Sequence, residues 1–222
     1  MNSKKIDLEF KIPHRNWLES SNELFALMNA VLPGEVIVVV GPSRAGKSRL
    51  IEYMCSLVSR AQEHEEKGLM PCVVVEVANC GQNGTFSTKN LAVRMLEKLK
   101  HPLFGIADDL TQEAKRLQLI SRTPGASLQL SAEIALRARG TRFLFLDEAQ
   151  HVSYAKNSER GASAIMNSWK CLARSANVVL IIVGAYPILS VLHDSPHMCI
   201  FWPNPITHSD FIRSSILELS DH

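Results

Sequence analysis

The sequence lacks the features that mark secreted, membrane-spanning and disulfide-stabilised proteins. Its 222 residues contain five cysteines, an odd number with no C-x-x-C pair, so neither a disulfide framework nor a zinc site is indicated. The N-terminal stretch MNSKKIDLEFKIPHR has no apolar core of the signal-peptide type, and no apolar run approaches the ~18 residues that span a membrane. We therefore expect a cytoplasmic protein with no membrane partner.

An excess of charge of one sign is also missing. The 24 Lys and Arg side chains and the 22 Asp and Glu side chains leave a net charge of +2, which is too small to indicate a polyanionic partner. Basic residues that contact such a partner must act through their positions. The length is ordinary for one domain with a substantial core.

Short β-branched runs alternate along the chain with segments of helical spacing. Strands are expected over residues 35–40, 72–78, 142–148 and 177–185, and a fifth over MCIFW (198–202). Helices are expected over residues 16–31, from the glycine-rich turn to about 61, 91–99, 109–121, 126–139, 159–175 and 207–219. This alternation predicts an α/β fold, a five-stranded parallel sheet with helices on both faces.

The stretch GPSRAGKS (41–48) fits the pattern G-x-x-x-x-G-K-[ST] and falls between an expected strand and an expected helix. Its glycines let backbone N–H groups surround phosphates, Lys47 adds positive charge, and the Ser48 hydroxyl can bind Mg²⁺. The alternative is a glycine-rich turn with an exposed lysine. The nucleotide-binding residues predicted from this motif are Gly41, Pro42, Ser43, Arg44, Ala45, Gly46, Lys47, Ser48 and Arg49.

The stretch FLFLDEAQ (143–150) supplies an acidic pair at the end of another expected strand. Asp147 is predicted to hold Mg²⁺ together with Ser48, and Glu148 to polarise the attacking water, so that Glu148 and Lys47 are the catalytic residues. The alternative is an acidic pair that caps the next helix.

Lys47 and Asp147 lie 100 residues apart, and we expect the strand over 72–78 to lie between their strands. That arrangement favours ATPases with an additional strand over GTPases and simple kinases. No N-K-x-D motif for reading guanine occurs, which agrees with ATP as the nucleotide.

The chain resembles the AAA+ ATPases of the TnsC/TniB group, which regulate target selection in bacterial DNA transposition. The resemblance covers about residues 30–206 and rests on the phosphate loop, VEVANCGQNGTFSTKNLAVRMLEKL, LFLDEAQHV, VVLIIVGAYPILSVL and IFWPNPI, in that order. It implies an N-terminal extension and helix (1–32), an AAA+ core (33–205) and a minimal lid helix (206–222).

The same resemblance implies a function. An ATP-bound homo-oligomer, a ring or a filament, would assemble on double-stranded DNA without reading its sequence. It would act with a target-selector protein and recruit or stimulate a transposase, and ATP hydrolysis would disassemble it.

Related proteins lay DNA against the loop and helix start after the second strand. The corresponding polar side chains suit contacts to phosphates, although Ser87 and Thr88 are also common N-cap types. The predicted DNA-binding residues are Thr85, Ser87, Thr88, Lys89 and Arg94. A second basic set brackets two expected helices and is expected to form a solvated face: Lys115, Arg116, Arg122, Arg137, Arg139 and Arg142.

Two positions depart from the family pattern. Ala185 stands where the family commonly carries a polar sensor residue, and alanine cannot hydrogen-bond a γ-phosphate. No arginine finger occurs between Gly184 and Phe201, which leaves His193, His197 or Arg213 as substitutes. ATP binding with weak hydrolysis is therefore expected. The alternatives are a replication-type loader, a small-molecule kinase and a non-hydrolysing scaffold.

Overall fold

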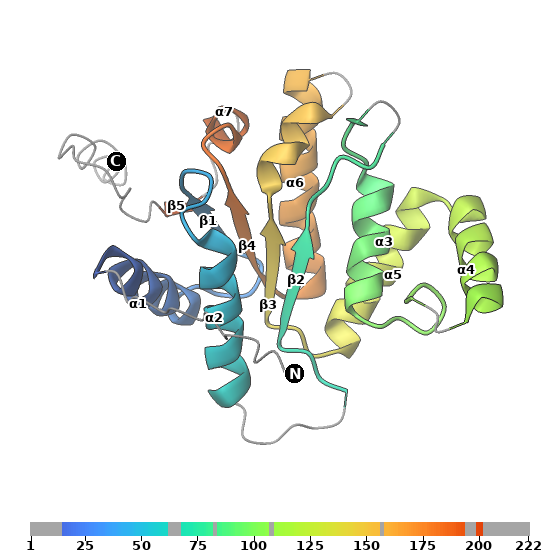
Figure 1. Cartoon of the computed structure of the whole chain (residues 1–222), viewed down its shortest axis with the longest axis horizontal. Coiled ribbons are helices and arrows are strands. Elements are labelled where there is room, and N and C mark those ends of the chain that lie inside the picture. Colours follow the sequence, from blue (N-terminus) through green and yellow to red (C-terminus); the bar gives the residue numbers. More distant parts are fainter. Residues whose placement is uncertain are drawn as a thin grey trace, which may run out of the picture.

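The computed structural model describes residues 15–61, 68–81, 84–106, 109–155, 158–193 and 199–201, which build one sheet with helices on both faces (Figure 1). The strands are β1 (Val36–Val40), β2 (Cys72–Glu76), β3 (Phe143–Asp147), β4 (Val179–Gly184) and β5 (Cys199–Phe201). All pairs are parallel, and the strand order is β2-β3-β4-β1-β5. The predicted α/β fold with a five-stranded parallel sheet is confirmed.

The helices form two layers and one outlying element (Figure 1). Helices α1 (Arg15–Ala30) and α2 (Lys47–Ala61) cover one face of the sheet. The other face carries α3 (Thr88–Lys98), α5 (Gly125–Ala138), α6 (Ser158–Ala176) and α7 (Ile188–His193). Helix α4 (Leu110–Arg122) lies outside α3 and α5, and no described helix is long and apolar enough to cross a membrane. The lid helix expected over 206–222 lies outside the described residues.

The central strands are buried on both faces, which explains their continuous apolar sequence. Because successive strand residues point to opposite faces, Ile37 of β1 packs in one layer with Met54 of α2. Its neighbour Val38 belongs to the other layer, with Leu96 of α3 and Met166 of α6. A strand covered on both sides has no position where a polar side chain reaches water.

The order of the strands corrects one expectation. The strand that lies between β1 and β3 is β4, whereas β2, which was expected there, pairs with β3 alone at the far edge. The connection from β1 to β2 passes the positions of β4 and β3, and this crossover is not visible in the order of the sequence. A short 3₁₀ helix, η2 (Ala149–Tyr154), which the sequence analysis did not anticipate, follows β3 directly.

The second basic set is a solvated face only in part, because Arg116 is buried and Arg139 is half-buried. Arg139 donates hydrogen bonds to the carbonyl oxygens of Leu99 (3.1 Å), Gly68 (3.0 Å) and Lys100 (3.2 Å), and so ties the end of α5 to two neighbouring segments. The guanidinium of Arg142 lies 4.9 Å from the ring centre of Phe143. Four members are exposed: Lys115, Arg122, Arg137 and Arg142.

Arg116 is the clearest exception, because its side chain is only 7% exposed. It donates to Glu97 of α3 at 2.7 Å, to Glu113 of its own helix at 2.9 Å and to the carbonyl oxygen of Phe104 at 3.2 Å. A buried guanidinium is stable only with such partners. Arg116 is also the one buried residue of α4, so this cluster attaches an otherwise exposed helix to the domain.

Replacing Arg116 by methionine should therefore lower the free energy of unfolding by about 2 kcal/mol, because Glu97 and Glu113 would lose their shared cation in a partly buried position. Urea denaturation measures this change. The matched control is Lys115→Met, an exposed neighbour on the same helix, which should change stability by less than about 0.5 kcal/mol. Equal stability of the two variants would contradict the role given to Arg116.

Candidate functional site

The segment between β1 and α2 turns sharply at the carboxyl edge of the sheet. Gly46 has φ +82° and Arg44 has φ +64°, a left-handed conformation that glycine adopts readily and arginine rarely. The N–H of Gly41 donates to the carbonyl oxygen of Gly184 (3.2 Å), which fixes the start of the loop to β4. The loop ends at the N-terminus of α2, where free N–H groups and the helix dipole favour an anion.

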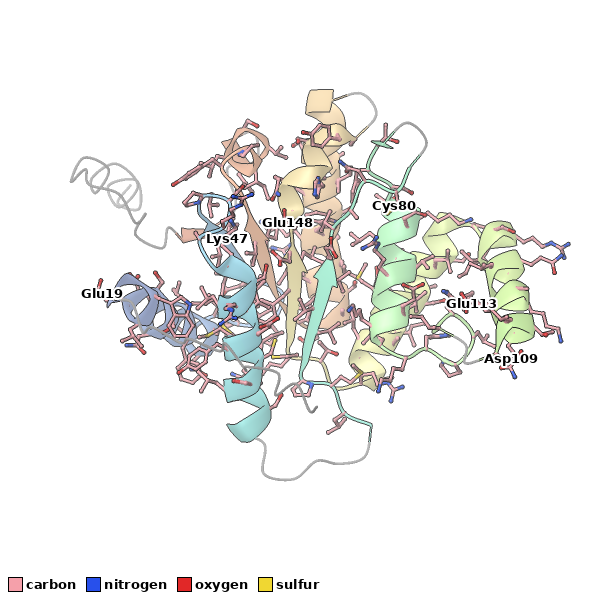
Figure 2. The ribbon with its side chains drawn as sticks, in the orientation of Figure 1. Glu19, Lys47, Cys80, Asp109, Glu113 and Glu148 are labelled. Carbon is pink, nitrogen blue, oxygen red and sulfur yellow. The ribbon has the colours of Figure 1, made fainter. Side chains whose placement is uncertain are left out.

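The side chain of Lys47 folds back over this loop. Its Nζ donates to the carbonyl oxygens of Gly41 (3.0 Å) and Pro42 (2.8 Å). Burial lowers the pKa of Lys47, and the charges of Glu148 and Asp147 oppose that shift. Figure 2 shows Lys47 and Glu148 at the same end of the sheet. A phosphate would offer the ammonium group a charged partner in place of two neutral carbonyls.

Ser48 and Asp147 meet across the sheet. The Ser48 hydroxyl donates to Asp147 Oδ2 at 2.8 Å, although the two residues lie 99 positions apart in the chain. Asp147 is 8% exposed, and its Oδ1 accepts a hydrogen bond from the backbone N–H of Glu148 (2.9 Å). The structure thus brings together the two residues that the sequence assigned to Mg²⁺.

These two side chains fit a magnesium ion that is held together with phosphates. Mg²⁺ takes hard oxygen ligands and usually combines one or two carboxylates with water and phosphate oxygens. Among the described residues, no three His, Cys, Asp or Glu side chains lie close enough together to hold a metal ion without water or phosphate ligands. The hydroxyl and carboxylate oxygens of Ser48 and Asp147 supply the protein's share of this set.

Glu148 leaves β3 in a left-handed conformation, with φ 56° and ψ 33°, immediately before η2. It occupies the N-cap position of η2 without a side-chain capping hydrogen bond, so capping does not explain this residue. Its carboxylate instead accepts a hydrogen bond from Nε2 of Gln150. Oε1 of Gln150 accepts one from the backbone N–H of Ala185, at 2.9 Å.

Gln150 is the site residue that the sequence analysis missed. It stands in the DEAQ stretch, two residues after Glu148, but its second partner follows β4 and lies 35 positions further along the chain. The motif therefore shows the glutamine but not the contact that gives it a role.

The predicted DNA-binding residues lie around the start of α3, beyond β2 from the phosphate loop (Figure 1). Ser87 is the N-cap of α3 and accepts from the N–H of Asn90 at 3.3 Å, as its alternative interpretation predicts. Lys89 donates to the carbonyl oxygen of Ser121 (3.1 Å). Arg94 donates to the carbonyl oxygen of Glu76 (3.4 Å), again in an exposed position. Thr85 and Thr88 flank this cap.

The fold and the site together define a P-loop nucleoside triphosphatase with an additional strand between the two motif-bearing strands. A family model for an AAA domain matches residues 33–192, and the chain belongs to that family. Comparison with curated protein sequences finds no match.

Solved structures show the same fold. The ORC2 protein of Aeropyrum pernix, in ADPNP and ADP complexes, aligns with a TM-score of 0.58 at 12% identity, over 87% of this chain and 49% of that one. The Walker-type ATPase PABY2304 of Pyrococcus abyssi aligns with a TM-score of 0.50 at 17% identity, over 79% of this chain and 46% of that one. This chain thus spans about half the length of either protein.

Replacing Lys47 by alanine should weaken the binding of Mg·ATP at least ~100-fold, because two charge-assisted hydrogen bonds to phosphate would be lost. Isothermal titration measures the dissociation constant. Lys98→Ala removes an exposed lysine at the end of α3 and should leave the affinity unchanged. A Lys47→Ala chain that binds as tightly as the parent would contradict the role of the loop.

Proposed function

We propose that the chain is a Mg²⁺-dependent ATPase that uses its nucleotide state to assemble on double-stranded DNA, as a regulator of transposition of the TnsC/TniB kind. The observation that supports the ATPase is the meeting of Lys47, Ser48, Asp147 and Glu148 at one edge of the sheet. The ORC2 protein of Aeropyrum pernix, which shares this fold, is described in ADPNP and ADP complexes, and this supports nucleotide binding by the present chain.

Each side chain has a defined task in this proposal. Lys47 and the N–H groups at the start of α2 bind the β- and γ-phosphates, and Ser48 and Asp147 hold Mg²⁺, which neutralises phosphate charge when bound. Glu148 accepts a proton from the water that attacks the γ-phosphate. These are the catalytic roles of Lys47 and Glu148.

Hydrolysis should be slow, because two groups that stabilise the transition state are missing. The methyl side chain of Ala185 cannot hydrogen-bond the γ-phosphate, and no arginine stands between Gly184 and Phe201 to reach the nucleotide of a neighbouring subunit. A slow ATPase suits a protein that must stay assembled until a transposase and a target-selector protein have acted.

The start of α3 is the proposed DNA contact. Lys89 donates to one carbonyl oxygen in an exposed position. Arg94 donates to the carbonyl oxygen of Glu76 and to Sγ of Cys80, and its guanidinium lies 4.0 Å from the exposed carboxylate of Glu76. Both side chains can therefore exchange these contacts for phosphates without breaking a buried ion pair. Helix N-termini and hydroxyl groups, such as those of Thr85 and Thr88, bind phosphates without reading the base sequence.

The test of this proposal is binding to a labelled duplex of random sequence, measured with ATP, with ADP and without nucleotide, at two salt concentrations. Binding should require ATP and should fall steeply with salt, because counterions are released from the phosphates. If the folded chain binds ATP but no DNA in any of these states, the DNA-binding function is wrong and a phosphotransferase becomes the better candidate.

The Glu148→Gln variant should assemble on DNA with ATP as the parent does, but dissociate at least ~10-fold more slowly, since the amide cannot accept a proton from water. The dissociation rate is measured after unlabelled duplex is added in excess. Glu133→Gln, which neutralises a half-buried carboxylate of α5, is the matched control. Dissociation at the parental rate would show that hydrolysis does not drive disassembly.

A further inference from the structure

Gln150 makes a contact at both ends of its amide group. Nε2 donates to Oε2 of Glu148, and Oε1 accepts from the backbone N–H of Ala185 at 2.9 Å. The side chain thereby joins the residue after β3 to the residue after β4, at the edge of the sheet that carries the phosphate loop.

The chemistry of its partners fixes the orientation of this amide. The carboxylate of Glu148 has only acceptor atoms, and the N–H of Ala185 can only donate. An amide turned by 180° would place oxygen against carboxylate and N–H against N–H, so it would lose both contacts. Gln150 therefore presents one orientation to Glu148, and a carboxylate of the same length at position 150 could not replace it.

The backbone of β4 leaves room for the amide. At Gly184, an added Cβ would lie 3.0 Å from Oε1 of Gln150 and 3.3 Å from its backbone N, which is closer than nearly all ordinary contacts. The next residue, Ala185, carries only a methyl group, so the N–H beside it is open to a side chain from η2. Gly184 and Ala185 are thus the residue types that allow Gln150 to reach β4.

A short series of hydrogen bonds connects this contact with the phosphate loop. The N–H of Gly41, where the loop begins, donates to the carbonyl oxygen of Gly184. The adjacent N–H of Ala185 binds Gln150, and Gln150 binds Glu148. These hydrogen bonds therefore connect both the start of the phosphate loop and the carboxylate of Glu148 to the peptide unit between Gly184 and Ala185, at the end of β4.

We propose that Gln150 is a positioning residue for Glu148, whose carboxylate it joins to the backbone at the end of β4. The inference rests on the proposed ATPase and specifies how its glutamate is held. With Oε2 bound to Gln150, the other carboxylate oxygen of Glu148 is left to accept the proton of water. A carboxylate fixed in this way does not have to be ordered during each turnover.

The experiment compares the full chain with Gln150→Met, which keeps the length of the side chain and removes both hydrogen bonds. The kcat for ATP should fall about 10- to 100-fold, while KM and the dissociation constant for ATP stay within about twofold, because no phosphate contact is lost. The backbone N–H of Ala185 should exchange with solvent faster. Gln118→Met, on the exposed side of α4, is the matched control and should change none of these values.

A second variant, Gly184→Ala, tests the same role even if Gln150→Met does not fold. Gly184→Ala retains Gln150 but places a methyl group 3.0 Å from Oε1, so it should also lower kcat with little change in KM. Agreement between the two variants would support the position of the amide, rather than the mere presence of glutamine, as the cause.

The possible failures are distinguishable. If the parent chain hydrolyses ATP and Gln150→Met does so equally fast or faster, the positioning role is wrong and the ATPase stands. A loss of ATP affinity equal to the loss of kcat would show that Gln150 only supports the structure of the site, and would also overturn the role. If the parent binds ATP but never hydrolyses it, the ATPase and the role of Gln150 both fall.

Discussion

The parallel direction of the strands is the constraint on which the whole site depends. Because β1, β3 and β4 run the same way, their carboxyl ends meet at one edge of the sheet, where ligands bind in open α/β folds. The phosphate loop follows β1, Asp147 ends β3 and Ala185 follows β4. The Ser48–Asp147 and Gly41–Gly184 hydrogen bonds can form only in this arrangement. Apolar burial on both faces of the sheet holds these three ends in register.

Two of the four described non-glycine residues with a positive φ lie where the phosphates are expected. Arg44 and Glu148 have left-handed conformations, each of which costs an L-residue roughly 1–2 kcal/mol. One lies within the phosphate loop and the other directly after Asp147. The fully buried strands that precede them, VIVVV and FLFLD, stabilise the domain enough to keep both turns in place. In both places a regular buried strand is followed directly by a turn that contains a left-handed residue.

Local spacing in the sequence predicted which residues the structure brings together at the carboxyl edge of the sheet. Lys47 and Ser48 follow from the glycine-rich pattern, and Asp147 from its place after an apolar run, so the structure only had to bring them together. Sequence reasoning did not find two other contacts, whose residues lie on or next to different helices or strands. The contacts of Gln150 with Ala185 and of Arg116 with Glu97 depend on crossovers and helix packing, and no local pattern encodes them. The place of β4 between β1 and β3 was hidden for the same reason.

The most direct test of this account is an experimental structure of the chain with Mg²⁺ and a non-hydrolysable ATP analogue. We expect Nζ of Lys47 to leave the carbonyl oxygens of Gly41 and Pro42 for the β- and γ-phosphates, with Mg²⁺ bound near Ser48 and Asp147. A nucleotide bound elsewhere, or a Lys47 side chain still folded onto the empty loop beside it, would contradict the assignment of this edge of the sheet as the ATP site.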